Sequence, residues 1–395
     1  MKRITGSSLG MILALSFSMG AFSPVPIHAR ASSDGDPVVI GTYRHIYSER
    51  LGEDRPLLVS LPEDYGESSA SYPVLYVLYG DQVRGYFAEA VHIVSRLSDE
   101  GSIPPMIIVG VANVDRYRDL SPVGRRGNPS GIEPFSRFVE KELVPFIDSE
   151  YRTKDYRVLV GPQAGAAFGL YTLAERPGLF DAYILENPFR SEAVRDVLMP
   201  MIERFIEEGT PSYTFIQITC SDREGYLDKV TEVEYMREFQ RMVERRDPAD
   251  LTLITRYVEN IPDFIPPLSL GEGLRELFGE YAFPGDREVR DLTDISSYYD
   301  SLSEKLGFEI MIPEKVLADE ASGLAEKGGS EAAIEILEYL IEIYPSSLNG
   351  YWRLANLYRE LGDRETAIEN YRKCLEIMPN MPPARHWLEK LEAGE

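Results

Sequence analysis

The chain alternates short, almost wholly apolar runs with longer segments in which apolar residues recur at helical spacing. Runs in which nearly every residue is apolar place apolar side chains on both faces of a strand. They are typical of parallel strands covered by helices on both faces. Amphipathic helices are predicted over 133–151, 191–208 and, more weakly, 236–245. Residues 36–283 therefore predict an α/β domain with a mostly parallel sheet flanked by helices. The predicted strands are 56–61, 74–78, 106–111, 157–160, 182–185, 215–219 and 253–258.

A second pattern follows a polar stretch over 284–313, which predicts a linker. Beyond it, small and apolar residues recur with a period of 34, as in Ala321 and Ala355, Gly328 and Gly362, and Pro345 and Pro379. This period is typical of tetratricopeptide repeats, in which small residues let paired helices approach and a glycine makes the turn. We expect residues 314–395 to form two such repeats and a closing helix over 382–391, supported by the larger domain.

The N-terminus has the pattern of a secretory signal peptide. Lys2 and Arg3 precede an apolar stretch over 9–22, and small residues flank a cleavage point after Ala31. A transmembrane anchor is the alternative, but it needs about 20 apolar residues, and this stretch is shorter and interrupted. We therefore expect residues 1–31 to be removed and the mature protein to be secreted or periplasmic, with no membrane span.

Charge and composition exclude several classes of function. The chain has 41 basic and 65 acidic residues, a net charge of −24 that becomes −27 without residues 1–31. Such a protein is repelled by phosphate backbones, which excludes nucleic-acid partners. Two cysteines and four histidines are too few for a disulfide scaffold or a structural zinc site. We expect no metal and no cofactor, and we expect Cys220 and Cys374 to be buried free thiols.

The most informative motif is a predicted strand that runs into Gly161-Pro162-Gln163-Ala164-Gly165 and then into a helix. In α/β-hydrolases this strand, turn and helix carry the sequence G-x-S-x-G, with glycines on both sides because the tight turn leaves no room for side chains. Here both glycines are present, but Gln163 stands at the central position.

The segments around this motif resemble the putative-esterase family of α/β-hydrolases, which includes enterochelin-esterase-like and esterase-D-like enzymes. The resemblance covers about residues 36–283, and a subset of that family carries a tetratricopeptide tail. It implies an α/β-hydrolase fold and a serine esterase with a nucleophile, a histidine base and an acid. The segments that carry it include 48–51, 72–78, 104–110, 118–122, 145–153 and 176–183.

The resemblance places the nucleophile on Gln163, the base on Pro262, and the acid on Asp222 or Glu224. A carboxamide is not a useful nucleophile, and a proline side chain neither accepts nor donates a proton. His45, His92 and Cys220 are the remaining candidates in the domain, but each is better interpreted as a surface or packed residue. Nucleophile and base are therefore expected to be absent.

The resemblance also implies backbone N–H donors that hold an oxyanion, from Ala164 and from the segment containing Tyr79 and Gly80. Backbone donors survive the replacement of a side chain. We therefore expect that this pocket binds an ester- or carboxylate-containing small ligand without cleaving it.

The leading hypothesis is a secreted, non-catalytic binding protein, a pseudoenzyme, whose repeat tail binds a peptide or protein. Trp352, Asn356 and Arg359 would lie on the concave side of the repeats and contact that partner; alternatively, Trp352 packs on the larger domain. A second hypothesis is an active carboxylic-ester hydrolase with a non-standard centre. In a third hypothesis the repeat tail carries the function, and the larger domain only supports it.

Overall fold

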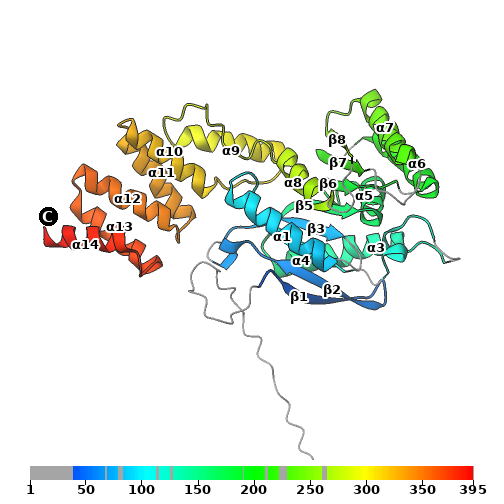
Figure 1. Ribbon diagram of the computed structural model, residues 1–395, viewed down its shortest axis with the longest axis horizontal. Helices are drawn as coiled ribbons and strands as arrows, with labels where there is room; N and C mark the ends of the chain where they lie inside the picture. Colours follow the sequence, from blue (N-terminus) through cyan, green and yellow to red (C-terminus); the bar gives the residue numbers. More distant parts are fainter. Residues whose placement is uncertain are drawn as a thin grey trace, which may run out of the picture.

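The computed structural model describes residues 39–66, 69–78, 83–112, 115–124, 128–189, 191–209, 212–221, 229–259 and 265–394. In these residues an eight-stranded sheet has helices on both faces, and a helical tail extends from one end of it (Figure 1). The strand order is β1-β2-β4-β3-β5-β6-β7-β8. The strands are β1 (Thr42–Ser48), β2 (Glu53–Ser60), β3 (Tyr72–Leu78), β4 (Ile107–Val111), β5 (Thr153–Pro162), β6 (Ala182–Glu186), β7 (Thr214–Ser221) and β8 (Leu251–Val258).

Strands β3 to β8 pair in parallel, whereas β1 and β2 form an antiparallel hairpin whose second strand pairs antiparallel with β4. All residues of β3, β4 and β6 are buried, as expected for strands covered on both faces. The predicted fold class is therefore confirmed. Strand β1 was not predicted, because five of its seven residues are exposed and it has no apolar run.

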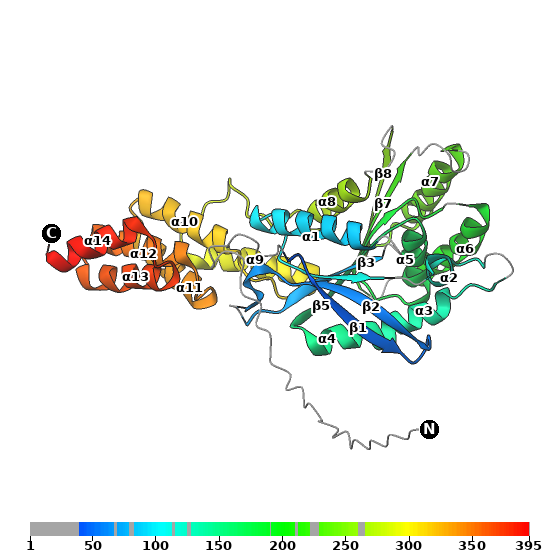
Figure 2. The ribbon, with the colours of Figure 1, turned by 60° about the horizontal axis from the view of Figure 1, so that its bottom comes forward.

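Helices α1 (Val83–Asp99) and α8 (Ile265–Leu277) cover one face of the sheet, as Figure 2 shows. The other face packs against the predicted helix 133–151, which a π-helical segment (Val139–Leu143) divides. Four further helices contribute to the same core. The helices outside the tail that remain to be named are the 3-10 helix Glu63–Gly66, α2 (Arg116–Leu120), α3 (Ile132–Phe138), α4 (Val144–Glu150), α5 (Ala164–Glu175), α6 (Glu192–Glu208) and α7 (Lys229–Arg246).

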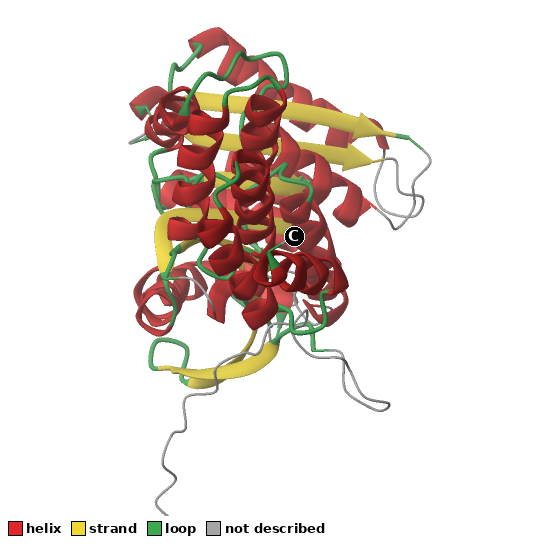
Figure 3. Cartoon of the chain, turned by 90° about the vertical axis from the view of Figure 1, so that its left-hand side faces the viewer, coloured by secondary structure: helices red, strands yellow, loops and turns green. Residues whose placement is uncertain are grey.

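The tail contains α9 (Leu292–Leu306), and this helix corrects the predicted linker over 284–313. Ile295, Tyr299, Leu302 and Leu306 are buried along one side of α9, so the polar residues between them form the exposed side of a helix. The repeat helices follow, and Figure 3 shows them stacked in front of the strands. They are α10 (Glu314–Glu326), α11 (Ser330–Ile343), α12 (Leu348–Leu361), α13 (Arg364–Ile377) and α14 (Pro382–Ala393).

One hydrophobic core joins the sheet to the tail. The cluster beneath α1 and α8 continues through α9 into α10 and α11, where Leu317 and Leu340 are fully buried. The ring of Phe308 lies 4.5 Å from the ring of Tyr156 on β5, centroid to centroid. The repeats therefore pack against the larger domain through a shared core. No helix among the described residues is long and apolar enough to cross a membrane.

Candidate functional site

The turn between β5 and α5 consists of Gln163 alone, since β5 ends at Pro162 and α5 begins at Ala164. Gln163 has φ 57° and ψ −110°, a conformation that residues with a Cβ atom rarely adopt. Such strain costs about 1–3 kcal/mol and persists only where the surrounding structure imposes it. The chain therefore makes the sharp strand-to-helix turn that the motif predicts; residues 161–165 are called the elbow below.

The two glycines of the elbow are required by backbone packing. A Cβ atom on Gly161 would lie 2.7 Å from the carbonyl carbon of Gly165. A Cβ atom on Gly165 would lie 2.4 Å from the carbonyl oxygen of Leu78, at the end of β3. Since real Cβ atoms do not approach backbone this closely, any side chain at either position would force the strands and α5 apart.

The elbow presents polar groups to solvent. Gln163 and Ala164 are partly exposed, and Gln163 carries both a donor and an acceptor in its carboxamide. The first N–H groups of a helix have no intrahelical partner and lie at the positive end of its dipole. The start of the 12-residue helix α5 can therefore hold a carbonyl or carboxylate oxygen.

Of the other residues predicted for this site, the structure describes Ala164, the first residue of α5. Asp222, Glu224 and Pro262 lie outside the described residues, as do Tyr79 and Gly80. Their predicted roles stay predictions.

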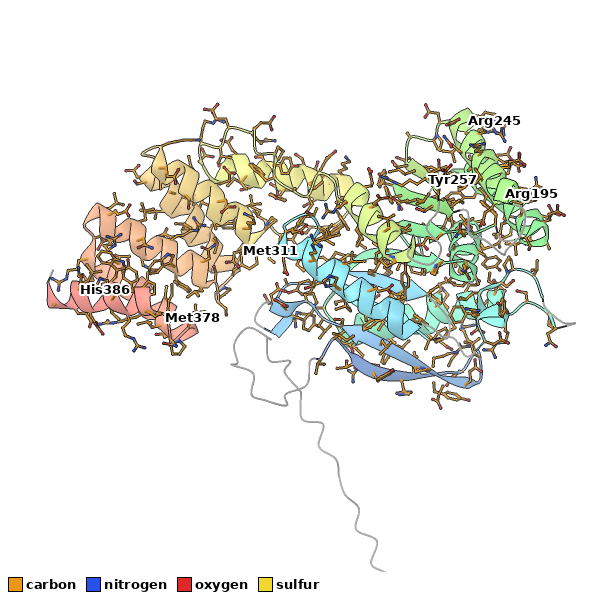
Figure 4. All side chains as sticks on the ribbon, in the orientation of Figure 1. Arg195, Arg245, Tyr257, Met311, Met378 and His386 are labelled. Carbon is orange, nitrogen blue, oxygen red and sulfur yellow. The ribbon has the colours of Figure 1, made fainter. Side chains whose placement is uncertain are left out.

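None of the described histidines lies near the elbow. His45 is exposed on the edge strand β1, four strand spacings or about 19 Å from β5. His92 is exposed on α1, nine residues or about 13 Å along the helix from its start. His386 lies on α14 at the far end of the tail (Figure 4).

Both cysteines are buried and free, as predicted. Cys220 on β7 belongs to the core beneath α5, α6 and α7, and burial raises its pKa well above the usual range. Burial also raises the pKa of Cys374 to about 12. A thiol nucleophile must ionise, so neither cysteine is suited to act as a nucleophile.

A cluster of buried polar side chains, not predicted from the sequence, lies behind the elbow on the face covered by α1 and α8. Ser269 of α8 donates a 2.9 Å hydrogen bond from its hydroxyl to the hydroxyl of Thr219 on β7. The Gln217 amide nitrogen donates to the carbonyl oxygen of Ser269 at 2.9 Å. This polar cluster consists of Tyr86, Glu186, Gln217, Thr219 and Ser269, each buried.

Glu186 connects the polar cluster to the elbow. It pairs directly with Pro162 of β5 and Thr219 of β7, and its carbonyl oxygen accepts a 2.6 Å hydrogen bond from the N–H of Gln163. Its side chain is 2% exposed and hydrogen-bonded to Ser269 and Tyr86, but its Oε1 has no partner. Burial, with the charge of Glu89 adding to it, raises the pKa of Glu186 well above its usual range. This environment therefore favours the neutral form of its carboxyl.

The repeat residues predicted to bind a partner are engaged within the tail. The Trp352 ring lies 5.6 Å from that of Tyr371, whose hydroxyl donates to the Asn356 side-chain oxygen at 2.9 Å. The Arg359 guanidinium lies 4.0 Å above the Trp387 ring of α14. The structure thus brings the three residues together, but around α13 and α14. Trp352 packs on the repeat rather than on the larger domain.

A cleft of about 1330 Å³ lies at the amino ends of β3 and β5, where the tail meets them. The elbow lies at the opposite, carboxyl end of the strands. Lys154 of β5 pairs there with Glu309 at 2.7 Å. Met311 of the connecting segment, labelled in Figure 4, also lines the cleft. Among the described residues, no group of three or more His, Cys, Asp or Glu side chains could hold a metal ion.

Residues 48–198 match the family model described as putative esterase. Residues 348–381 match that of a tetratricopeptide repeat. Both predicted resemblances are confirmed over these segments.

A curated relative is the ferri-bacillibactin esterase BesA of Bacillus subtilis (strain 168), 32% identical over 139 residues. The match covers 30% of this chain and 48% of BesA, so the chain spans about half the length of that relative.

Two solved structures share the fold. An IroE-like serine hydrolase from Shewanella oneidensis has a TM-score of 0.64 and 23% identity, over 77% of this chain and 99% of that one. An uncharacterised protein from Capnocytophaga ochracea has a TM-score of 0.58 and 18% identity, over 89% of this chain and 99% of that one. The chain therefore combines an esterase-like α/β fold with a tetratricopeptide tail.

Proposed function

We propose that this protein is a non-catalytic binding protein built on an esterase fold, which holds a carbonyl- or carboxylate-containing ligand at the elbow. The observation that carries this proposal is the strained turn at Gln163. The elbow keeps the backbone geometry that hydrolases use to present a nucleophile, although a carboxamide stands there instead. Strain of this kind is typical of functional sites.

The ligand would be held by the backbone N–H groups at the start of α5 and by the Gln163 carboxamide. Neither group is changed by the loss of a nucleophile or a base. The similarity to a ferri-bacillibactin esterase makes iron-loaded bacillibactin the first ligand to test, because an esterase that has lost its chemistry retains a pocket of the same kind.

A two-part experiment tests the proposal. The protein lacking residues 1–31 is incubated with a fluorophosphonate probe and with short p-nitrophenyl esters; we expect neither covalent labelling nor turnover. Calorimetric titration with iron-loaded bacillibactin should give saturable binding. Gln163→Ala should weaken that binding, whereas Glu203→Ala, at an exposed position on α6, should not. Absence of binding to the unmodified protein would show that iron-loaded bacillibactin is not the ligand. Stoichiometric labelling would show that the protein is catalytically active.

The alternative, an active carboxylic-ester hydrolase with a non-standard centre, makes opposite predictions. It requires turnover that is lost when Asp222, His45 or Cys220 is changed. The exposed position of His45 on the far edge of the sheet and the burial of Cys220 both weigh against it. Replacing Gln163 by serine alone should not create turnover, because a serine needs a base within hydrogen-bond reach.

We further propose that the tail provides a surface for a peptide or protein partner, and that the mature protein is secreted or periplasmic. Since Trp352, Asn356 and Arg359 pack within the tail, the partner would contact other side chains of the repeats. Mass spectrometry of the protein produced in its own cells, with cleavage after Ala31, would test the location.

A further inference from the structure

The buried carboxyl of Glu186 lies where two helices meet the sheet directly behind the elbow. Tyr86 reaches it from α1 and Ser269 from α8, and both are hydrogen-bonded to it. Thr219 is its direct partner on β7. The carboxyl therefore connects β6 to α1 and α8 at the carboxyl end of the sheet.

The groups around Glu186 are hydroxyls and acids. Glu89, three residues after Tyr86 on α1, adds a negative charge that acts on Glu186. On α8, Glu272 and Glu276 form ion pairs with Arg256 of β8, whose side chain is thereby engaged. Among the described residues, no ion pair joins a cation to Glu186.

An ionised Glu186 would consequently bury a charge without a cation. Such a charge is very costly in a protein interior, because hydroxyl partners replace only part of the hydration that the carboxylate loses. Oε1 lacks even a hydroxyl partner. The charge becomes tolerable only when water reaches the carboxylate, and this requires α1 or α8 to move away from β6.

We propose that Glu186 is a proton-controlled latch: its neutral carboxyl keeps α1 and α8 packed on the end of β6, and loss of its proton to solvent releases them. The sign follows from linkage. The closed form holds the proton more tightly than the open form, so closing is favoured at low pH and weakens as pH rises through the interval between the two pKa values.

The latch would regulate ligand binding at the elbow, and in this respect it rests on the function proposed above. Gln163 is hydrogen-bonded to the backbone of Glu186, and α1 begins five residues after β3 ends beside Gly165. Release of the two helices from Glu186 would therefore loosen the support of the elbow. The site is therefore expected to be most ordered at low pH and to loosen progressively as the pH rises.

Amide hydrogen exchange tests the latch without any ligand. Protection factors, corrected for intrinsic exchange, are measured for the protein lacking residues 1–31 at pH 5, 7 and 9. Protection of α1 and α8 should fall by about tenfold for each pH unit over the interval in which one proton is released. Helix α6, on the other face of the sheet, should change much less. Glu186→Gln should remove the fall in α1 and α8.

Two further variants keep the test decisive if Glu186→Gln does not fold. Glu89→Gln, at an exposed position, removes the neighbouring charge, so the total fall in protection should be smaller than in the unmodified protein. Glu203→Gln on α6 should behave like the unmodified protein. Protection of α1 that is independent of pH, or a fall of unchanged size in Glu89→Gln, would overturn the latch. Neither result bears on the binding assay, so the two proposals fail separately.

Discussion

The backbone N–H of Gln163 donates a 2.6 Å hydrogen bond to the carbonyl oxygen of Glu186. This bond ties the strained turn to the neighbouring strand β6, and it is one of the contacts that hold Gln163 at φ 57°. The same residue, Glu186, directs its side chain into the polar cluster. The exposed elbow and the buried acid are thus parts of one structure.

Removing the side chain at the turn should make the protein more stable. Glycine adopts positive φ without strain, so Gln163→Gly should raise the free energy of unfolding by about 1 kcal/mol after its larger chain entropy is subtracted. Urea unfolding measures the change. Gln163→Ala is the matched control, because alanine keeps the Cβ atom and the strain. Equal stability of the glycine and alanine variants would show that the turn is not strained.

Two glycines should respond in opposite directions to the same substitution. Gly165→Ala places a Cβ atom 2.4 Å from the carbonyl oxygen of Leu78 and should destabilise the protein by about 1–3 kcal/mol. Gly271, inside α8, has Ile93 at 3.8 Å as its nearest neighbour, so Gly271→Ala should stabilise it by about 0.5–1 kcal/mol. Thermal unfolding of both variants measures the contrast. Equal effects would contradict the close packing of the elbow.

The sequence predicted the elbow but not the acid behind it. A strand followed by two glycines four residues apart is a local signal, and the reason for both glycines is local packing. The polar cluster instead depends on the register of β5, β6 and β7 and on the position of Ser269 some 50 residues further on. The one available signal was a glutamate at the carboxyl end of an apolar strand.

In the tail, too, the sequence pattern predicted the elements but not the contacts between them. Its period predicted the repeat helices, including the closing helix α14. The period did not predict that Trp387 of α14 covers Arg359, because that contact depends on how the last helix stacks. Nor did composition distinguish α9 from a linker, since only one side of that helix is apolar.

Asp181 should make stability depend on pH. Burial raises its pKa to about 6, and its carboxylate accepts a 2.7 Å hydrogen bond from the Arg157 backbone N–H. The folded state therefore binds a proton more tightly than the unfolded chain, whose Asp pKa is about 3.9. Its contribution to stability is complete below pH 4, falls up to about pH 6 and is then constant.

Asp181→Asn should remove this component, which is on the order of 2 kcal/mol. Urea midpoints of the variant and the unmodified protein at pH 4, 5, 6 and 7 measure the difference. The difference between the two proteins should change between pH 4 and about pH 6 and stay constant above about pH 6. Parallel curves throughout would contradict the raised pKa.

The shared core predicts that the tail and the larger domain unfold together. Both tryptophans, Trp352 and Trp387, lie in the tail, so their fluorescence reports unfolding of the tail alone. Leu270 of α8 is fully buried in the core that the two parts share, and Leu270→Ala should cost about 2–5 kcal/mol. If the parts form one cooperative unit, this distant substitution should lower the urea midpoint of tryptophan fluorescence as much as that of far-UV circular dichroism. Leu340→Ala, on α11, should shift both signals in the same way. If Leu270→Ala leaves the fluorescence midpoint unchanged, the tail unfolds as an independent module. That result would favour the hypothesis in which the repeats work alone.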